Sequence, residues 1–279
     1  MMPVRSSRLP ATIVTLLGMA LAAPLPAQEA PPDSVPQHDT LMLPSRALDE
    51  TRRINVHTPQ GYSASDTTAF PVLYMPDGGL DEDFPHVVNT VDSLIALGAI
   101  RAVIVVGVPN SERRRDLTGP TRVRSDSAIA PRIGGSAAFR RFWREELVPA
   151  IDAHYRTTSE RSIVGESLAG LFIVETFLRE PTIFDRYIAF DPSLWWNHGA
   201  LVDSAKELLA ARKASSPQHR SLYIAASRDD IGKQAARLAS TLRASAPRGL
   251  ELKFDARPDL THGTIFRALL PAALVSTLR

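Results

Sequence analysis

The chain contains no cysteine among its 279 residues. This absence excludes disulfide bonds, thiolate metal sites, a cysteine nucleophile and a cysteine-linked lipid anchor. The chain also lacks a surplus of charge, because 32 basic side chains stand against 30 acidic ones and the formal net charge is +2. Proteins that bind nucleic acid carry a basic patch or stripe that contacts the phosphates. The near balance of charge therefore argues against a nucleic-acid partner.

One apolar run near the N-terminus, ATIVTLLGMALAAPLPA at residues 11–27, follows a short basic segment that holds no acid. A basic start, an apolar run and small residues, in this order, predict a secretory signal peptide over residues 1–27. An uncleaved anchor helix is the alternative. However, Pro24 and Pro26 leave about a dozen apolar residues, fewer than the roughly 20 that span a bilayer. We therefore expect a soluble exported product, periplasmic or secreted, without a stable membrane anchor.

The rest of the chain predicts one α/β domain. Residues 28–45 begin proline-rich and polar, which predicts a flexible leader, and residues 46–279 alternate apolar runs with amphipathic segments. The runs FPVLYMPDGG and RAVIVVGVPN are continuous and end at turn residues, as buried parallel strands do. This alternation predicts a mainly parallel, doubly wound sheet with helices on both faces. In such sheets the chemistry gathers at the carboxyl ends of the strands.

The segment RSIVGESLAGLFIV, residues 161–174, has the pattern of a buried strand, a tight turn and a buried helix. It approximates the nucleophile elbow G-x-S-x-G, with Ala169 at the last position and Gly170 after it. Small residues are needed around this turn because the strand and the helix approach closely, and Gly165 meets this need. Ser167 is therefore the candidate nucleophile. The alternative is an ordinary serine at a helix N-cap.

A serine nucleophile needs a base, and the base needs an acid that orients it. His262 stands between the last predicted strand and the last helix, as the chain order Ser, acid, His requires. The acid is expected after the strand SLYIAAS, where Asp229 and Asp230 both stand. We favour Asp230 as the acid, although either aspartate also suits a helix N-cap.

Two backbone N–H groups are expected to bind the oxyanion of the reaction. Leu168 follows the nucleophile, and Gly79 lies in the loop after FPVLYMP, where glycine permits close approach to a ligand. This loop also holds four acids, Asp77, Asp81, Glu82 and Asp83. A divalent-cation site is one interpretation, but the spacing matches no calcium loop. A solvated acidic helix start is the better interpretation, so we expect neither a metal nor a cofactor.

Four segments carry a resemblance to a known family: FPVLYMPDGG, VIVVGVPNSERRRDLTGP, the long run from FRRFW to SLWW, and THGTIFRALLPAAL. They extend from about Arg52 to the C-terminus. The chain resembles the esterases related to esterase D, and within them the enterochelin esterase-like branch, which includes periplasmic hydrolases of trilactone siderophores. The resemblance implies an α/β-hydrolase fold, Ser167 as nucleophile and His262 as base. It also implies an acid after the penultimate strand and oxyanion donors after MPDG.

The chain departs from this family around the nucleophile. Family members usually read Gly-His-Ser-x-Gly-Gly, whereas this chain has Glu166 and Ala169. The Glu166 side chain places a potential negative charge beside the nucleophile, which either repels acidic substrates or pairs with an arginine such as Arg115. Some siderophore esterases work with a serine–histidine pair, so the resemblance leaves the identity of the acid open.

Two features suggest how a substrate is held. The loop PNSERRRDLTGPTRVR is rich in arginine, and Arg115 is the best candidate in it for an anionic group, against the alternative of a solvated loop. Trp195 and Trp196 follow the strand RYIAFDP and are candidates for the wall of an acyl or aromatic pocket, against the alternative of packing.

The leading hypothesis is a secreted serine esterase that acts on a small-molecule carboxylic ester through an acyl-enzyme. Two alternatives stay open. An acyltransferase would pass the same acyl group to an alcohol acceptor, and an inactive homologue would only bind its ligand.

Overall fold

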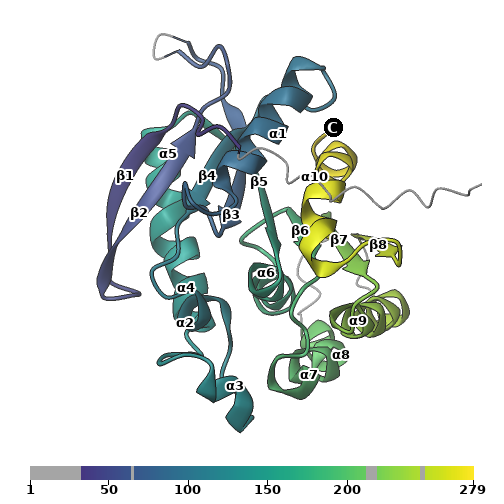
Figure 1. Cartoon of the computed structure of the whole chain (residues 1–279). Helices are drawn as coiled ribbons and strands as arrows, with labels where there is room; N and C mark the ends of the chain where they lie inside the picture. Colours follow the sequence, from purple (N-terminus) through teal and green to yellow (C-terminus); the bar gives the residue numbers. More distant parts are fainter. Residues whose placement is uncertain (1–32, 64–65, 212–218, 246–248) are drawn as a thin grey trace, which may run out of the picture. The chain divides into compact units, whose positions relative to one another are not determined.

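The computed structural model describes residues 33–63, 66–211, 219–245 and 249–279 (Figure 1). The predicted signal peptide, residues 1–27, lies outside the described residues. No helix within the described ranges is both long enough and apolar enough to cross a membrane.

The described part of the chain contains an eight-stranded sheet in the order β1-β2-β4-β3-β5-β6-β7-β8. The strands are β1 (Asp39–Ser45), β2 (Glu50–His57), β3 (Phe70–Pro76), β4 (Ile104–Val108), β5 (Thr157–Glu166), β6 (Arg186–Phe190), β7 (Arg220–Ser227) and β8 (Leu250–Arg257). β2 is antiparallel to both of its neighbours, whereas every pair from β4 to β8 along the sheet is parallel. The carboxyl ends of these six strands therefore meet at one edge.

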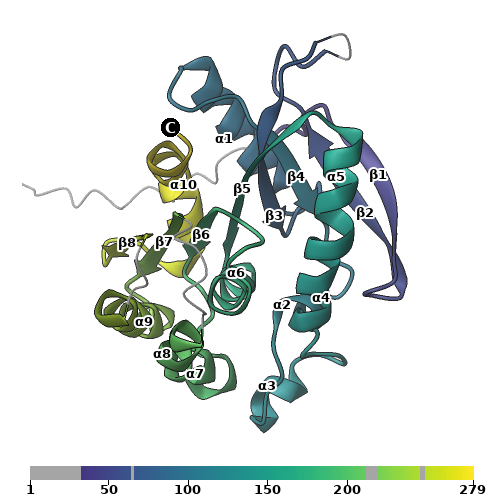
Figure 2. The same cartoon turned by 180° about the vertical axis from the view of Figure 1, so that it is seen from behind.

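Helices cover both faces of the sheet (Figures 1 and 2). They are α1 (Phe84–Ala96), α2 (Arg113–Leu117), α3 (Arg124–Ala128), α4 (Ser136–Phe142), α5 (Val148–His154), α6 (Leu168–Arg179), α7 (Trp196–Asp203), α8 (Ala205–Ala210), α9 (Ile231–Ser245) and α10 (His262–Leu278). A π-helical turn, Trp143–Leu147, joins α4 to α5. Buried side chains of α1 and α10 form one core cluster, and those of α4, α5, α6 and α9 belong to another. The predicted doubly wound α/β architecture is confirmed.

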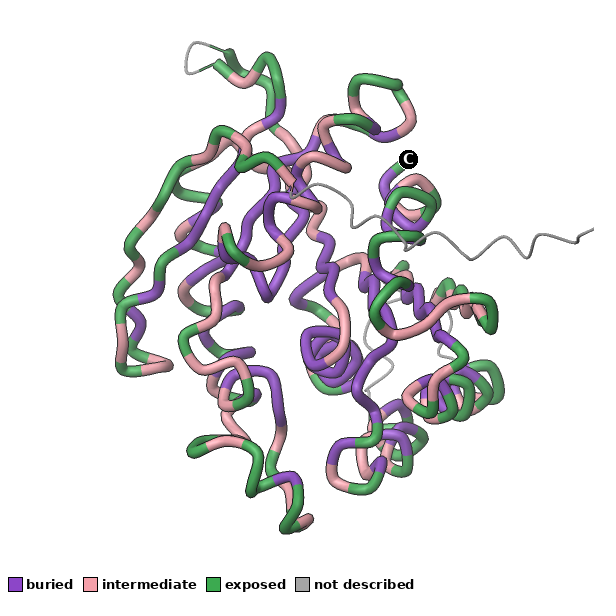
Figure 3. The backbone as a smooth tube through the Cα atoms, viewed as in Figure 1, coloured by how far each residue is buried: buried purple, intermediate pink, exposed green. Residues whose placement is uncertain are grey.

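The central strands are buried on both faces, which explains why their sequences are continuously apolar. All five residues of β4 are buried, with Ile104 and Val106 in the cluster under α4 to α6, and Val105 in the cluster under α1 and α10. Successive side chains of a strand point to opposite faces, so a strand covered on both sides has no polar position. Figure 3 shows the resulting buried centre.

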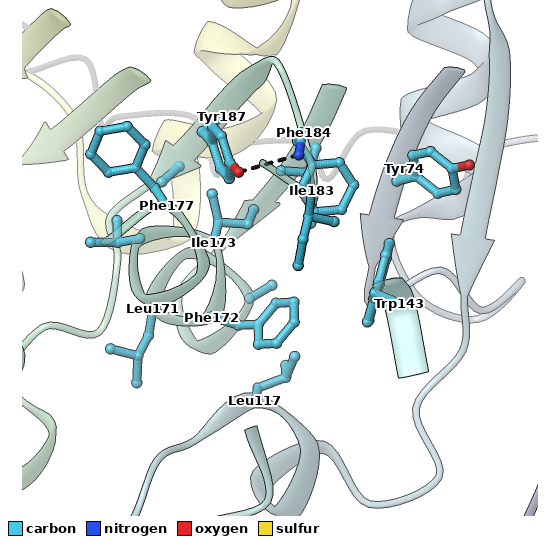
Figure 4. Close-up of a cluster of buried hydrophobic side chains, with 14 of the residues drawn as sticks. Tyr74, Leu117, Trp143, Leu171, Phe172, Ile173, Phe177, Ile183, Phe184 and Tyr187 are labelled. Carbon is cyan, nitrogen blue, oxygen red and sulfur yellow. Dashed lines mark hydrogen bonds between the residues drawn. The ribbon is translucent and has the colours of Figure 1, made fainter. Parts of the chain in front are cut away.

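An aromatic cluster fixes α6, the helix that follows the predicted nucleophile, against its surroundings (Figure 4). The ring of Phe172 in α6 lies 5.1 Å from Phe139 and 6.1 Å from Trp143, centroid to centroid. The Phe184 backbone N–H donates to the Tyr187 hydroxyl in the same cluster, over 3.3 Å. Interlocking rings of this kind leave the helix little freedom to shift.

The prediction of a flexible leader over residues 28–45 is wrong for the last seven of these residues. These form β1, which pairs with β2 from Asp39↔Val56 to Ser45↔Glu50. The alternating Leu41 and Leu43 pack against the core, which is the period-two pattern of a half-covered strand.

Candidate active site

Ser167 sits at a sharp turn between β5 and α6, at the carboxyl edge of the sheet. Its backbone has φ 60° and ψ −118°, a combination that non-glycine residues rarely adopt. Glycine is needed on both sides. A Cβ on Gly165 would lie 2.7 Å from the Ala169 Cβ, and a Cβ on Gly170 would lie 3.0 Å from the Pro192 Cα. Strained backbone of this kind is typical of active sites, and it is the geometry of a nucleophile elbow.

Hydrogen bonds from the neighbouring strand hold this turn. The Ser167 N–H donates to the Phe190 carbonyl over 3.0 Å, and the Ser167 carbonyl accepts the Ser193 N–H over 2.9 Å. The two hydroxyls, Ser167 Oγ and Ser193 Oγ, lie 3.3 Å apart. The segment after β6 is therefore built directly against the nucleophile.

His262 is brought to the same edge by the start of α10. Its Nδ1 lies 3.2 Å from Asp191 Oδ2, and Asp191 is fully buried at the end of β6. The other oxygen, Asp191 Oδ1, accepts the Ser227 N–H over 2.7 Å. Burial opposes ionisation of Asp191, but the hydrogen bonds from His262 and Ser227 outweigh it and hold its pKa below the usual range. The same contact raises the pKa of His262.

The structure places Asp191, and not Asp230, beside the imidazole, so the prediction of Asp230 as the acid is wrong in this geometry. The Asp230 carboxylate is 92% exposed and pairs with Lys233 over 2.7 Å, one turn into α9. Asp229 has a third role, because its Oδ2 accepts the backbone N–H of His262 over 2.7 Å. It thus anchors the first residue of α10, the one that carries the imidazole.

Glu166 also faces the imidazole. Its Oε1 lies 3.9 Å from His262 Nδ1 and, within the described residues, this buried oxygen has no hydrogen-bond partner. Burial raises the pKa of Glu166 to about 7, against the attraction of His262. The predicted pairing of Glu166 with Arg115 does not form, since the Arg115 guanidinium binds Glu50 and Asp116.

The two predicted oxyanion donors differ in their surroundings. Leu168 is the first residue of α6, and N–H groups of a first helical turn have no partner within the helix. The Gly79 N–H, by contrast, donates to Glu82 Oε2 over 2.7 Å. The loop that presents Gly79 is held by Arg113, which binds both oxygens of Asp77 at 2.7 Å.

The predicted substrate residues fall into three situations. Arg115 is engaged by Glu50 and Asp116, which leaves it a structural partner of β2 rather than a free cation. Trp196 is buried and donates its Nε1–H to the Gly119 carbonyl over 2.8 Å. Trp195 is 41% exposed at the site edge, so of these three it is the one available to a ligand.

No group of three or more His, Asp or Glu side chains within the described ranges is arranged to hold a metal ion. Two acids of the loop after β3, Asp77 and Glu82, are instead bound to protein groups. Asn110 Nδ2, for example, donates to Asp77 Oδ1 over 2.6 Å and to Glu82 Oε1 over 2.7 Å. That the chemistry needs no metal or cofactor stays a prediction.

The part of the chain that builds most of this site matches a known protein family. The family described as "Putative esterase" matches residues 45–257, which is more than half of the chain. The chain belongs to this esterase family. The resemblance inferred from the sequence is thereby confirmed, and this esterase is a carboxylic ester hydrolase of the α/β-hydrolase fold.

Known relatives of this esterase include siderophore esterases. The ferri-bacillibactin esterase BesA of Bacillus subtilis is 29% identical over 203 residues, 66% of this chain and 68% of the relative. The siderophore triacetylfusarinine C esterase of Aspergillus fumigatus is 31% identical over 167 residues, 55% of this chain and 54% of the fungal protein. Among solved structures, an IroE-like serine hydrolase from Shewanella oneidensis superposes with a TM-score of 0.77 at 26% identity. The superposition covers 86% of this chain and 79% of the other.

Two residues of the site, Asp191 and Ser193, were not singled out from the sequence, and the bond between Glu82 and the Gly79 N–H was not expected. A signal for Asp191 was present, because it follows the strand RYIAF directly, whereas Arg228 separates Asp229 from SLYIAAS. No local pattern indicates the contact of Glu82 with Gly79.

Proposed function

We propose that this esterase is exported and hydrolyses ester bonds of siderophores, with Ser167, His262 and Asp191 as its catalytic triad. The observation that carries the triad is the 3.2 Å contact of His262 Nδ1 with Asp191 Oδ2, at the edge that presents Ser167. The names of the relatives support siderophores as the substrate class. Export rests on the signal-like pattern of residues 1–27.

The geometry gives each residue a role in acyl transfer. Asp191 engages Nδ1 of His262, which leaves Nε2 as the basic nitrogen. Ser167 Oγ attacks the ester carbonyl carbon while its proton passes to Nε2, and the carbonyl oxygen becomes an oxyanion. Collapse of this intermediate breaks the bond to the alcohol oxygen, which takes the proton from Nε2. Water, deprotonated by His262, then attacks the acyl-enzyme and releases the acid and Ser167.

The hydroxyl and the imidazole are not hydrogen-bonded in the described part of this structure, where Ser167 Oγ contacts Ser193 Oγ instead. Catalytic hydrogen bonds are often long in the absence of substrate and tighten in the complex. The exposed position of His262, with 41% of its side chain accessible, leaves the ring room to turn toward Ser167.

The test compares the wild-type protein with Ser167→Ala on p-nitrophenyl acetate and on trilactone siderophores, iron-bound and iron-free. We expect Ser167→Ala to lose at least about a thousandfold in kcat, since the nucleophile acts as a unit with its base. A fluorophosphonate should label the wild type at Ser167 and leave Ser167→Ala unlabelled. Equal hydrolysis by the two proteins would reject the assignment of the triad. Wild-type activity on p-nitrophenyl acetate but on none of the siderophores would reject siderophores as the substrate class.

A further inference from the structure

The residue before the nucleophile presents a second carboxylate to the imidazole. His262 Nδ1 lies 3.2 Å from Asp191 Oδ2 and 3.9 Å from Glu166 Oε1. The two carboxylates come from neighbouring strands, because Glu166 ends β5 and pairs in register with Phe190, the last residue of β6. Both therefore reach the imidazole from the sheet.

Glu166 has no competing partner that would explain its position structurally. Its Oε1 is buried and, in the described residues, accepts no hydrogen bond, whereas a buried carboxylate oxygen without a partner is costly. Proteins retain such costs mainly at functional sites. Once it is protonated, the His262 imidazole is a cation that faces this oxygen, with Nδ1 3.9 Å away.

We propose that Glu166 is a positioning residue for His262: its carboxylate places a second negative charge beside Nδ1, next to the hydrogen bond with Asp191, and stabilises the imidazolium that forms when Ser167 attacks. The proposal rests on the catalytic role proposed for Ser167 and His262. Glu166 touches no substrate in this role, because it acts through the imidazole. One consequence is that the acid function is divided between two carboxylates.

The electrostatics of the site agree with this role. Burial raises the pKa of Glu166 to about 7, and the nearby charge of His262 opposes that rise. The carboxylates act on the imidazole in turn, because the hydrogen bond with Asp191 and, to a smaller extent, the charge of Glu166 raise the pKa of His262. Ionisation of Glu166 near neutral pH therefore strengthens the base as the pH rises, and the two groups titrate as a pair.

Other charged groups lie near this pair. Three of them are acids that act on Glu166 or on His262: Asp77 and Asp83 before α1 and Asp229 after β7. Arg113 and Arg267 flank Asp83 and lower its pKa, which burial raises to about 6. None of these groups contacts His262 Nδ1 in the described structure, so the two carboxylates at 3.2 and 3.9 Å dominate its environment.

The experiment measures kcat/KM against pH for wild type, Glu166→Gln and Glu166→Asp on p-nitrophenyl acetate, which does not titrate. Rates are divided by the number of sites that a fluorophosphonate labels, so that an unfolded fraction does not count. Glu166→Gln keeps the shape and removes the charge. We expect the acidic limb of its profile of kcat/KM against pH to move about 1 unit to lower pH. We expect the plateau of the same profile to fall about tenfold. Glu166→Asp should keep the limb near that of the wild type.

Asp81→Asn is the matched control, because Asp81 is an exposed acid of the loop after β3, and the carboxylates beside His262 Nδ1 in the described residues are those of Asp191 and Glu166. It should leave the limb in place. A second measurement needs no activity: the NMR titration of His262 in a Ser167→Ala background should show a lower imidazole pKa when Glu166 becomes glutamine.

The outcomes separate the two proposals. An unmoved limb together with an unmoved His262 titration, in a protein whose Ser167→Ala variant is inactive, overturns the role of Glu166 alone. A Glu166→Gln plateau above that of the wild type overturns it as well, because the charge would then oppose the oxyanion. Wild-type hydrolysis by Ser167→Ala overturns the catalytic assignment and the role of Glu166 together.

Discussion

Gly79 donates its backbone N–H to Glu82 Oε2 over 2.7 Å, in the loop from which a second oxyanion donor is expected. The other oxygen of this carboxylate accepts the side-chain amide of Asn110 over 2.7 Å. A donor that already binds a carboxylate cannot bind a substrate oxyanion at the same time. If Gly79 is the second donor, a substrate carbonyl must displace Glu82.

The first prediction concerns this displacement. Glu82→Ala frees the Gly79 N–H, so we expect kcat/KM on p-nitrophenyl acetate to rise about five- to tenfold, a part of the 10²–10³ that one oxyanion donor contributes. Asp81→Ala, which removes the neighbouring exposed acid, is the control and should change the rate less than about twofold. A lower rate in correctly folded Glu82→Ala would mean that Glu82 shapes the loop for catalysis.

The second prediction separates two aspartates. Asp191 contacts the imidazole and Asp230 points to solvent, 92% exposed. Asp191→Asn is expected to lose about 10²–10⁴ in kcat, as removal of a triad acid does, with the smaller loss if Glu166 substitutes for it. Asp230→Asn is expected to stay within about twofold of the wild type. Steady-state kinetics at pH 8 check both, and equal losses in the two variants would contradict this assignment of the acid.

The sequence predicts the nucleophile and the base because both follow from local patterns and chain order. Ser167 has the strand, the small residues and the helix of an elbow around it, and His262 stands before the last helix. To predict the acid, one must also know which strand lies beside β5 in the sheet. In the sheet that strand is β6, and β7 lies beyond it, so Asp191 lies one strand closer to the nucleophile than the Asp229–Asp230 loop.

Charged residues of the loops were the hardest to predict, since their partners come from distant strands. Arg115 meets Glu50, which starts β2, only because the antiparallel β2 brings its beginning to this edge. The leader is a different case. The alternation of Leu41 and Leu43 in β1 was present in the sequence. The segment just before it is rich in proline, and the prediction of a flexible leader was extended from that segment over β1.

The third prediction concerns stability against pH. The folded-state pKa of Glu166, about 7, lies above the usual value of 4.5 for a glutamate, so the folded protein holds a proton that the unfolded chain releases between these values. Stability therefore falls as the pH rises through this window. Glu166→Gln cannot ionise, and we expect it to gain about 1–3 kcal/mol over the wild type at pH 8.5 and nothing at pH 4. Thermal melts at the two pH values test this, and an equal difference at both would refute it.

The last prediction separates the two tryptophans after β6. Trp196 is buried and donates to the Gly119 carbonyl, so Trp196→Ala should lose about 3–5 kcal/mol of stability, which urea unfolding would measure. Trp195 is 41% exposed, with its ring centroid 6.0 Å from that of Trp196, and its truncation should leave the unfolding midpoint nearly unchanged. If Trp195 walls the acyl site, Trp195→Ala raises KM for an aromatic ester several-fold but not for acetate, since stacking contributes about 0.5–1.5 kcal/mol. An equal change in KM for both esters would show that the ring does not contact the acyl group.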